Sequence, residues 1–173
     1  GALRVEMNEA GELGPLSATL QIGEGVLQPN DSTQPVPFQA ARTYFTYDPS
    51  EQIVQFDEIN LQSQWVTLRA DGKLGLVMSE TGLPSAFTGQ LRFDEIRAKP
   101  GDFLSDEVSF DSGFADMQMS LDPFRVSLGQ LNLKDGNTSF HVEGAFDALP
   151  EGWSYQLQAG ARGLAVEHVL RLW

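Results

Sequence analysis

Apolar and polar residues alternate along most of this chain, and this alternation restricts it to β-structure. Leu16, Ala18 and Leu20, for example, are separated by Ser17 and Thr19. A period of two places every second side chain on the same face of a strand. One apolar and one polar face are typical of an antiparallel sheet that is solvated on one side. The alternating stretches are residues 3–7, 16–22, 74–78, 87–93, 117–121, 138–142 and 153–159.

Polar, glycine-containing segments interrupt these stretches and predict tight turns. Asp71 with Gly72, residues 111–113 and residues 134–137 combine aspartate or asparagine with glycine, the residues that hairpin turns prefer. Residues 28–42 contain three prolines and several polar side chains, so this segment is predicted to be the longest loop.

A loose internal repeat runs through the chain. Residues 56–59 (Phe-Asp-Glu-Ile) recur as residues 93–96 and, more loosely, as residues 128–131 (Leu-Gly-Gln-Leu), so the repeat is about three dozen residues long. In each copy one extra residue breaks the period of two. That residue would turn the following side chains to the other face unless a β-bulge or a sharp bend absorbs it. A bend at the same place in successive copies would curl the sheet into a trough.

The fold class expected is therefore all-β: a repetitive antiparallel meander, curled into a groove or an open sandwich, with a short C-terminal helix. Residues 1–173 are interpreted as a single β-repeat segment, with approximate units 1–42, 43–86, 87–121 and 122–163. Residues 164–173 form the predicted helix, because Val166, Val169, Leu170 and Trp173 follow helical spacing.

Composition excludes several classes of function. The net charge of −13 argues against binding nucleic acid, which requires a basic face, and against docking on an anionic bilayer surface. The absence of cysteine excludes disulfides and thiolate metal sites. No stretch approaches the roughly 18 apolar residues of a membrane span.

Candidate catalytic groups are sparse, and none of them forms a recognisable motif. The two histidines, His141 and His168, lie on polar faces without a serine or aspartate at a nucleophile–base spacing. The repeated pairs Asp57–Glu58 and Asp94–Glu95 are interpreted as the solvated side of a bend. A calcium site over Asp102, Asp106, Glu107 and Asp111 is considered and set aside, because strand-like apolar residues interrupt the run. No enzyme activity, catalytic residue, metal or cofactor is predicted.

The order of the segments resembles the AsmA-like superfamily of large Gram-negative envelope proteins, in particular their YhdP-type periplasmic domain. The resemblance rests on residues 14–27, with Gly23, Gly25 and Leu27, on residues 44–48, on the strand pattern of residues 54–61, on residues 70–72, and on the C-terminal segment 164–173, which ends in Leu172 and Trp173. Family members are several times longer and begin with a membrane helix.

The resemblance implies a periplasmic protein, anchored in the inner membrane when full-length, with a curled β-sheet whose concave face is apolar. It implies a non-catalytic role in phospholipid transport between the inner and outer membranes and in outer-membrane biogenesis, with phospholipid acyl chains, and envelope proteins, as partners. The candidates for the groove lining are Val54, Phe56, Ile59, Leu61, Leu68, Phe93, Ile96, Val126, Leu128, Leu131, Leu133, Phe140 and Val142.

The same alternation would also produce a closed core, so the pattern alone leaves an open groove and a closed module as alternatives. The competing hypothesis for function is a structural or protein-binding β-module of the periplasm or cell surface, whose exposed strand edges receive partner strands.

Overall fold

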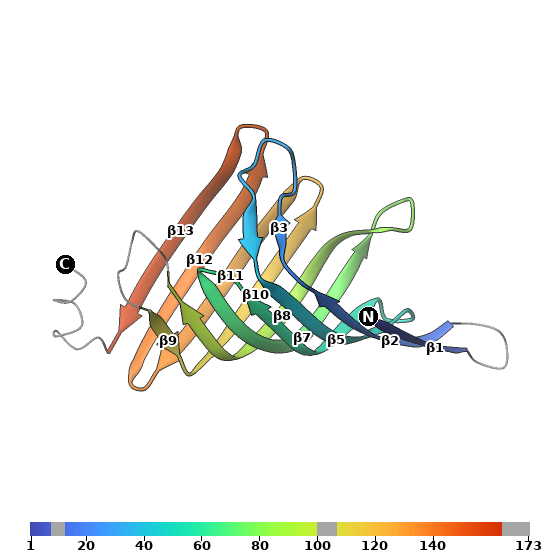
Figure 1. Ribbon diagram of the computed structural model, residues 1–173, viewed down its shortest axis with the longest axis horizontal. Helices are drawn as coiled ribbons and strands as arrows, with labels where there is room; N and C mark the ends of the chain where they lie inside the picture. Colours follow the sequence, from blue (N-terminus) through green and yellow to red (C-terminus); the bar gives the residue numbers. More distant parts are fainter. Residues whose placement is uncertain (8–12, 100–106, 164–173) are drawn as a thin grey trace.

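A computed structural model describes residues 1–7, 13–99 and 107–163 as strands and the turns that join them (Figure 1). The predicted helix over residues 164–173 lies outside the described residues. The strands are β1 (Ala2–Met7), β2 (Leu13–Ile22), β3 (Gly25–Leu27), β4 (Val36–Phe38), β5 (Ala40–Asp48), β6 (Ile53–Gln62), β7 (Val66–Met78), β8 (Pro84–Ala98), β9 (Val108–Phe110), β10 (Ser112–Leu121), β11 (Phe124–Asp135), β12 (Thr138–Leu149) and β13 (Gly152–Arg162).

Ten of these strands form one open antiparallel sheet, in the order β1-β2-β5-β6-β7-β8-β10-β11-β12-β13. The short strand β9 pairs with β8, and β3 and β4 pair only with each other as a separate hairpin. Apart from that hairpin and β9, neighbours in the sheet follow one another along the chain, as a meander requires. The all-β antiparallel fold is confirmed, and the sheet does not close on itself.

A β-bulge absorbs the extra residue in all three copies of the repeat. Asp57 is the unpaired residue where β6 faces β5, Asp94 where β8 faces β7, and Gly129 where β11 faces β10. Apolar side chains therefore stay on one face on both sides of each break. The prediction of a bulge is confirmed. The bulges do not lie side by side, however, because successive copies are offset along their strands.

That offset is visible in the register. Phe56 and Leu131 occupy the same cross-strand row, although the first opens its repeat copy and the second closes it. Phe93, which also opens its copy, lies in the adjacent row with Ile59 and Ala70. The bends are therefore staggered across the sheet and are not aligned as the repeat alone indicated.

Two of the predicted turns are wrong. Asp71 and Gly72 lie inside β7. Asp111 joins β9 to β10, but these strands form no hairpin because both pair with β8, and Gly113 lies inside β10. Residues 136–137, by contrast, do connect β11 to β12 as predicted. Gly72 has a φ of 155°, and a Cβ there would overlap the backbone oxygen of Gln90 on β8. Glycine is needed at this position for a close approach between two strands, which makes the same demand on the backbone as a turn.

The described part of the sheet is a single layer, so few side chains are buried. Nine apolar residues qualify, and five of them are alanines. Large side chains such as Phe56, Phe93 and Leu131 remain partly exposed. Within residues 1–7, 13–99 and 107–163, the second sheet is only the two-stranded β3–β4 hairpin. The architecture is therefore that of an open sheet and differs from a closed sandwich.

Candidate functional site

One face of the ten-stranded sheet is continuously apolar. The clearest row crosses every strand, each residue being paired with the next. All of its members are apolar or glycine: Leu3, Ala18, Phe45, Phe56, Gly72, Leu91, Ala115, Leu131, Val142 and Ala159. Nine strand spacings of about 4.8 Å make this row about 43 Å wide if it is measured along the sheet. We call this surface the apolar face.

Every candidate lining residue lies on the apolar face. Leu61, Leu68 and Ile96 form one row, and Leu133 with Phe140 continues the row of Ile59 and Phe93. Val54 and Leu128 share a row, and Val126 lies in the row beyond it. Val54, Ile96 and Leu133 are buried, and the other ten are partly exposed.

Several residues of the apolar face are absent from the candidates drawn from the repeat. Phe45, Leu91, Met117 and Met119 belong to it. Three of the four lie in the alternating stretches 87–93 and 117–121, so simple alternation is a better guide to this face than the repeat.

The opposite face carries charged pairs between neighbouring strands. Arg42 donates to Glu58 at 2.9 Å, Arg92 to Asp71 at 2.9 Å, and Arg125 to Asp147 at 2.8 Å. The hydrogen bond from Arg42 holds the pKa of Glu58 below its usual value. These partly exposed pairs contribute little to stability. They indicate which face of the sheet stays in contact with water, because burying these charges would cost free energy.

The candidate acid–base groups belong to this polar face. Asp57 and Asp94 are the exposed bulge residues, which agrees with their interpretation as the solvated side of a bend. His141 Nδ1 lies 3.0 Å from Asn132 Oδ1, within a surface hydrogen bond. His168, Asp102 and Asp106 lie outside the described residues. In the described part of the chain, no three His, Asp or Glu side chains gather as a metal site would require.

The β3–β4 hairpin crosses in front of the sheet in Figure 1, and its tip lies beside the turn between β12 and β13. Two hydrogen bonds fix it there: Asn30 Nδ2 donates to the Ala148 carbonyl at 3.2 Å, and Trp153 Nε1 donates to the Gln34 carbonyl at 2.7 Å. The predicted loop over residues 28–42 is correct for residues 28–35 and wrong for the rest, where β4 and the start of β5 lie. We call residues 23–39 the strap.

The contact between Gln34 and Trp153 shows that the sheet coils. In a flat sheet, seven strand spacings, or about 34 Å, would separate β5 from β13. The six residues from Gln34 to Ala40 span at most about 20 Å, too little to bridge that gap even with the length of an indole side chain. Trp153 pairs with Ala148 and packs edge-on against Phe124, at the end of the apolar face. The sheet therefore coils towards its apolar face, which becomes the inside of a trough.

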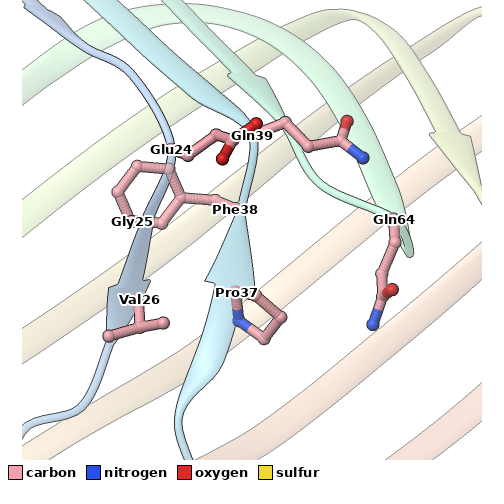
Figure 2. Close-up of a pocket in the computed structure, with 7 residues that line it drawn as sticks. All are labelled: Glu24, Gly25, Val26, Pro37, Phe38, Gln39 and Gln64. Atoms are coloured by element: carbon pink, nitrogen blue, oxygen red, sulfur yellow. The ribbon is translucent and has the colours of Figure 1, made fainter.

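A hollow of about 480 Å³ lies between the strap and the turn that joins β6 to β7 (Figure 2). Val26, Pro37 and Phe38 give it apolar walls, and Glu24, Gln39 and Gln64 add polar groups at its margin. Its volume falls in the range of about 300–1,000 Å³ that small-molecule sites occupy.

One polar atom on the apolar face has no partner in the described structure. The Thr43 hydroxyl is buried between Leu20 and Ile59 without a hydrogen bond. The described side chains around it on this face are mainly apolar, so the face is suited to contact with an apolar ligand.

Comparisons with protein families, with characterised proteins and with solved structures find no match for this chain. Among the described residues, no helix is long and apolar enough to cross a membrane.

Proposed function

We propose that this chain binds the acyl chains of phospholipids in the trough formed by its apolar face. In this proposal it is a non-catalytic, periplasmic segment of an AsmA-like envelope protein, which is anchored in the inner membrane when full-length and takes part in phospholipid transport between the two membranes and in outer-membrane biogenesis. The observation that carries the proposal is the row of apolar residues that crosses all ten strands, in which every residue except Ala115 remains at least partly exposed.

The partial exposure of the apolar face supports its interpretation as a ligand-binding surface and argues against a closed hydrophobic core. Soluble proteins rarely expose contiguous apolar patches larger than a few hundred Å², and larger ones mark binding sites. Leu20, Ile22 and Leu157 are each more than 40% exposed although they belong to the apolar face. An acyl chain would cover such residues, while its headgroup would stay in water at the rim.

The free energy of binding is more favourable if the acyl chain is covered on more than one side. An acyl chain gains about 0.8 kcal/mol for each CH₂ group removed from water, and roughly half of that if the sheet covers one side only. About 15 CH₂ groups would then contribute about 6 kcal/mol, against an association cost of at least about 4 kcal/mol. The open face alone would bind weakly, so the strap is expected to add to the affinity.

Titration with cis-parinaric acid, whose fluorescence rises in apolar surroundings, tests the proposal. We expect a saturable rise with an apparent Kd of about micromolar order, equivalent to about −8 kcal/mol. The titration belongs at physiological ionic strength, where a Debye length of about 8 Å limits repulsion between the acidic protein and the anionic probe. A signal that never saturates and is not displaced by unlabelled oleic acid would favour the alternative, a structural or protein-binding β-module.

A further inference from the structure

The strap has an unusual composition for a solvated hairpin, because both of its faces are apolar. Gly25 pairs with Phe38 and Leu27 with Val36 on one face, and Val26 pairs with Pro37 on the other. Val26 is 57% exposed and Leu27 is 46% exposed. A hairpin solvated on one side normally places polar residues on that side. Two apolar faces are suited to contact with an apolar ligand.

Hydrogen bonds within the tip of the strap help to hold its shape. Asn30 Oδ1 accepts hydrogen bonds from the backbone N–H groups of Ser32 and Thr33, and the Thr33 hydroxyl donates to the Asn30 carbonyl. Thr33 is only 2% exposed, and Gln28 donates to its carbonyl. These hydrogen bonds do not depend on the two that join the tip to the β12–β13 turn.

The strap is joined to the sheet at its two ends and at few points between them. At its base, the Gln39 N–H donates to the Gln62 carbonyl at 2.8 Å. At its tip, the hydrogen bonds from Asn30 and Trp153 hold it to the β12–β13 turn. Neither β3 nor β4 pairs with a strand of the described sheet. Gly23, at the start of the strap, has no heavy atom within 4 Å of where a Cβ would lie, which leaves room for a hinge.

We propose that the strap is the roof of the acyl-chain site and that its tip is a latch. With the tip held on the β12–β13 turn, the hairpin face that carries Val36 and Phe38, which is less exposed than the face of Val26 and Pro37, covers the chain on the side that faces away from the sheet. Release of the two hydrogen bonds lifts the roof, so that a chain can enter the trough from the side. This inference rests on the proposed function and adds to it the element that controls access.

Cross-linking the tip to the turn tests the latch. Because the chain has no cysteine, Ser32→Cys and Glu151→Cys introduce the only two thiols. Both positions are exposed, and the Ser32 carbonyl lies 3.8 Å from where a Cβ on Gly152 would lie, so a short bis-maleimide can bridge the two thiols. The measurement is the rate of the fluorescence rise after mixing with cis-parinaric acid. Each single-cysteine variant, treated with the same reagent, is the matched control.

We expect the bridged protein to take up the probe at least about tenfold more slowly than the controls, since lid opening limits access to such sites. Trp153→Phe removes the donor to Gln34 but keeps an aromatic ring beside Phe124, and it is expected to speed uptake. Equal rates in bridged and control proteins would overturn the latch and leave acyl-chain binding intact. Absence of binding in the unmodified protein would instead remove the proposed function, and the latch with it.

Discussion

Replacement of Gly72 by alanine is expected to destabilise the protein by about 3 kcal/mol or more, one of the largest effects of any single substitution in this chain. Gly72 has a φ of 155°, which side chains rarely adopt. A Cβ at this position would overlap the backbone oxygen of Gln90 and lie 3.0 Å from the Leu91 Cα. Because both obstacles are backbone atoms of the neighbouring strand, β7 and β8 would have to separate.

Gly75 provides the matched control on the same strand. A Cβ there would lie 3.7 Å from the Thr88 oxygen, an ordinary contact, and its φ needs no glycine. Gly75→Ala is therefore expected to change stability by less than about 1 kcal/mol, and the change can be stabilising. Urea unfolding of the two variants measures the difference. Equal midpoints would contradict the close approach of β7 and β8 at Gly72.

Replacement of Leu131 by glutamate is expected to weaken acyl-chain binding strongly while leaving the fold intact. Leu131 lies between Ala115 and Val142 in the row that crosses the whole sheet, and it is partly exposed. A carboxylate there stays solvated in the empty trough but loses its water when an acyl chain lies over it. Affinity for cis-parinaric acid should fall at least tenfold, about 1.4 kcal/mol.

Gln118→Glu adds the same charge on the opposite face and controls for repulsion of the anionic probe. Gln118 is exposed on β10, opposite Thr88 and Ser127. Its substitution should leave both binding and stability nearly unchanged. If Leu131→Glu unfolds the protein, as a charge in a closed core would, the open trough is contradicted. If both variants bind equally, the ligand does not lie on the apolar face.

Much of the sheet could be predicted because its signals are local. Alternation assigns a face to each side chain within a strand, and the extra residue in residues 56–59 demands a bulge wherever the strand is paired. The position of each bulge relative to its neighbours could not be predicted in this way. It depends on the lengths of the hairpins between the copies. Because of these lengths, Phe56, the first residue of its copy, shares a row with Leu131, the last residue of another copy.

Two errors show where local signals fail. Asp71 and Gly72 have the composition of a turn, yet glycine is used there because two strands approach closely. A turn and a close approach both require backbone freedom, and composition does not distinguish them. In the strap, Pro37 indicated a loop, although proline is tolerated in a short hairpin with solvated edges.

The contact between the tip of the strap and the β12–β13 turn is the feature that could least be predicted from the sequence. Gln34 and Trp153 are separated by 119 residues, and neither belongs to a motif. Their contact exists because the whole sheet coils, which is a property of ten strands together. The trough, and therefore the candidate site, depends on that coiling. A list of apolar residues describes its lining but gives neither its curvature nor its roof.

Photolabelling tests most directly whether acyl chains lie along the apolar face. The protein is irradiated with a fatty acid that carries a diazirine near the end of its chain, and the labelled residues are mapped by mass spectrometry. We predict adducts on apolar-face residues such as Phe56, Leu91 and Leu131, and on Phe38 of the strap. The same experiment with excess oleic acid should remove them. Competed adducts on Gln118, Lys73 and Gln90 of the polar face instead would contradict the account.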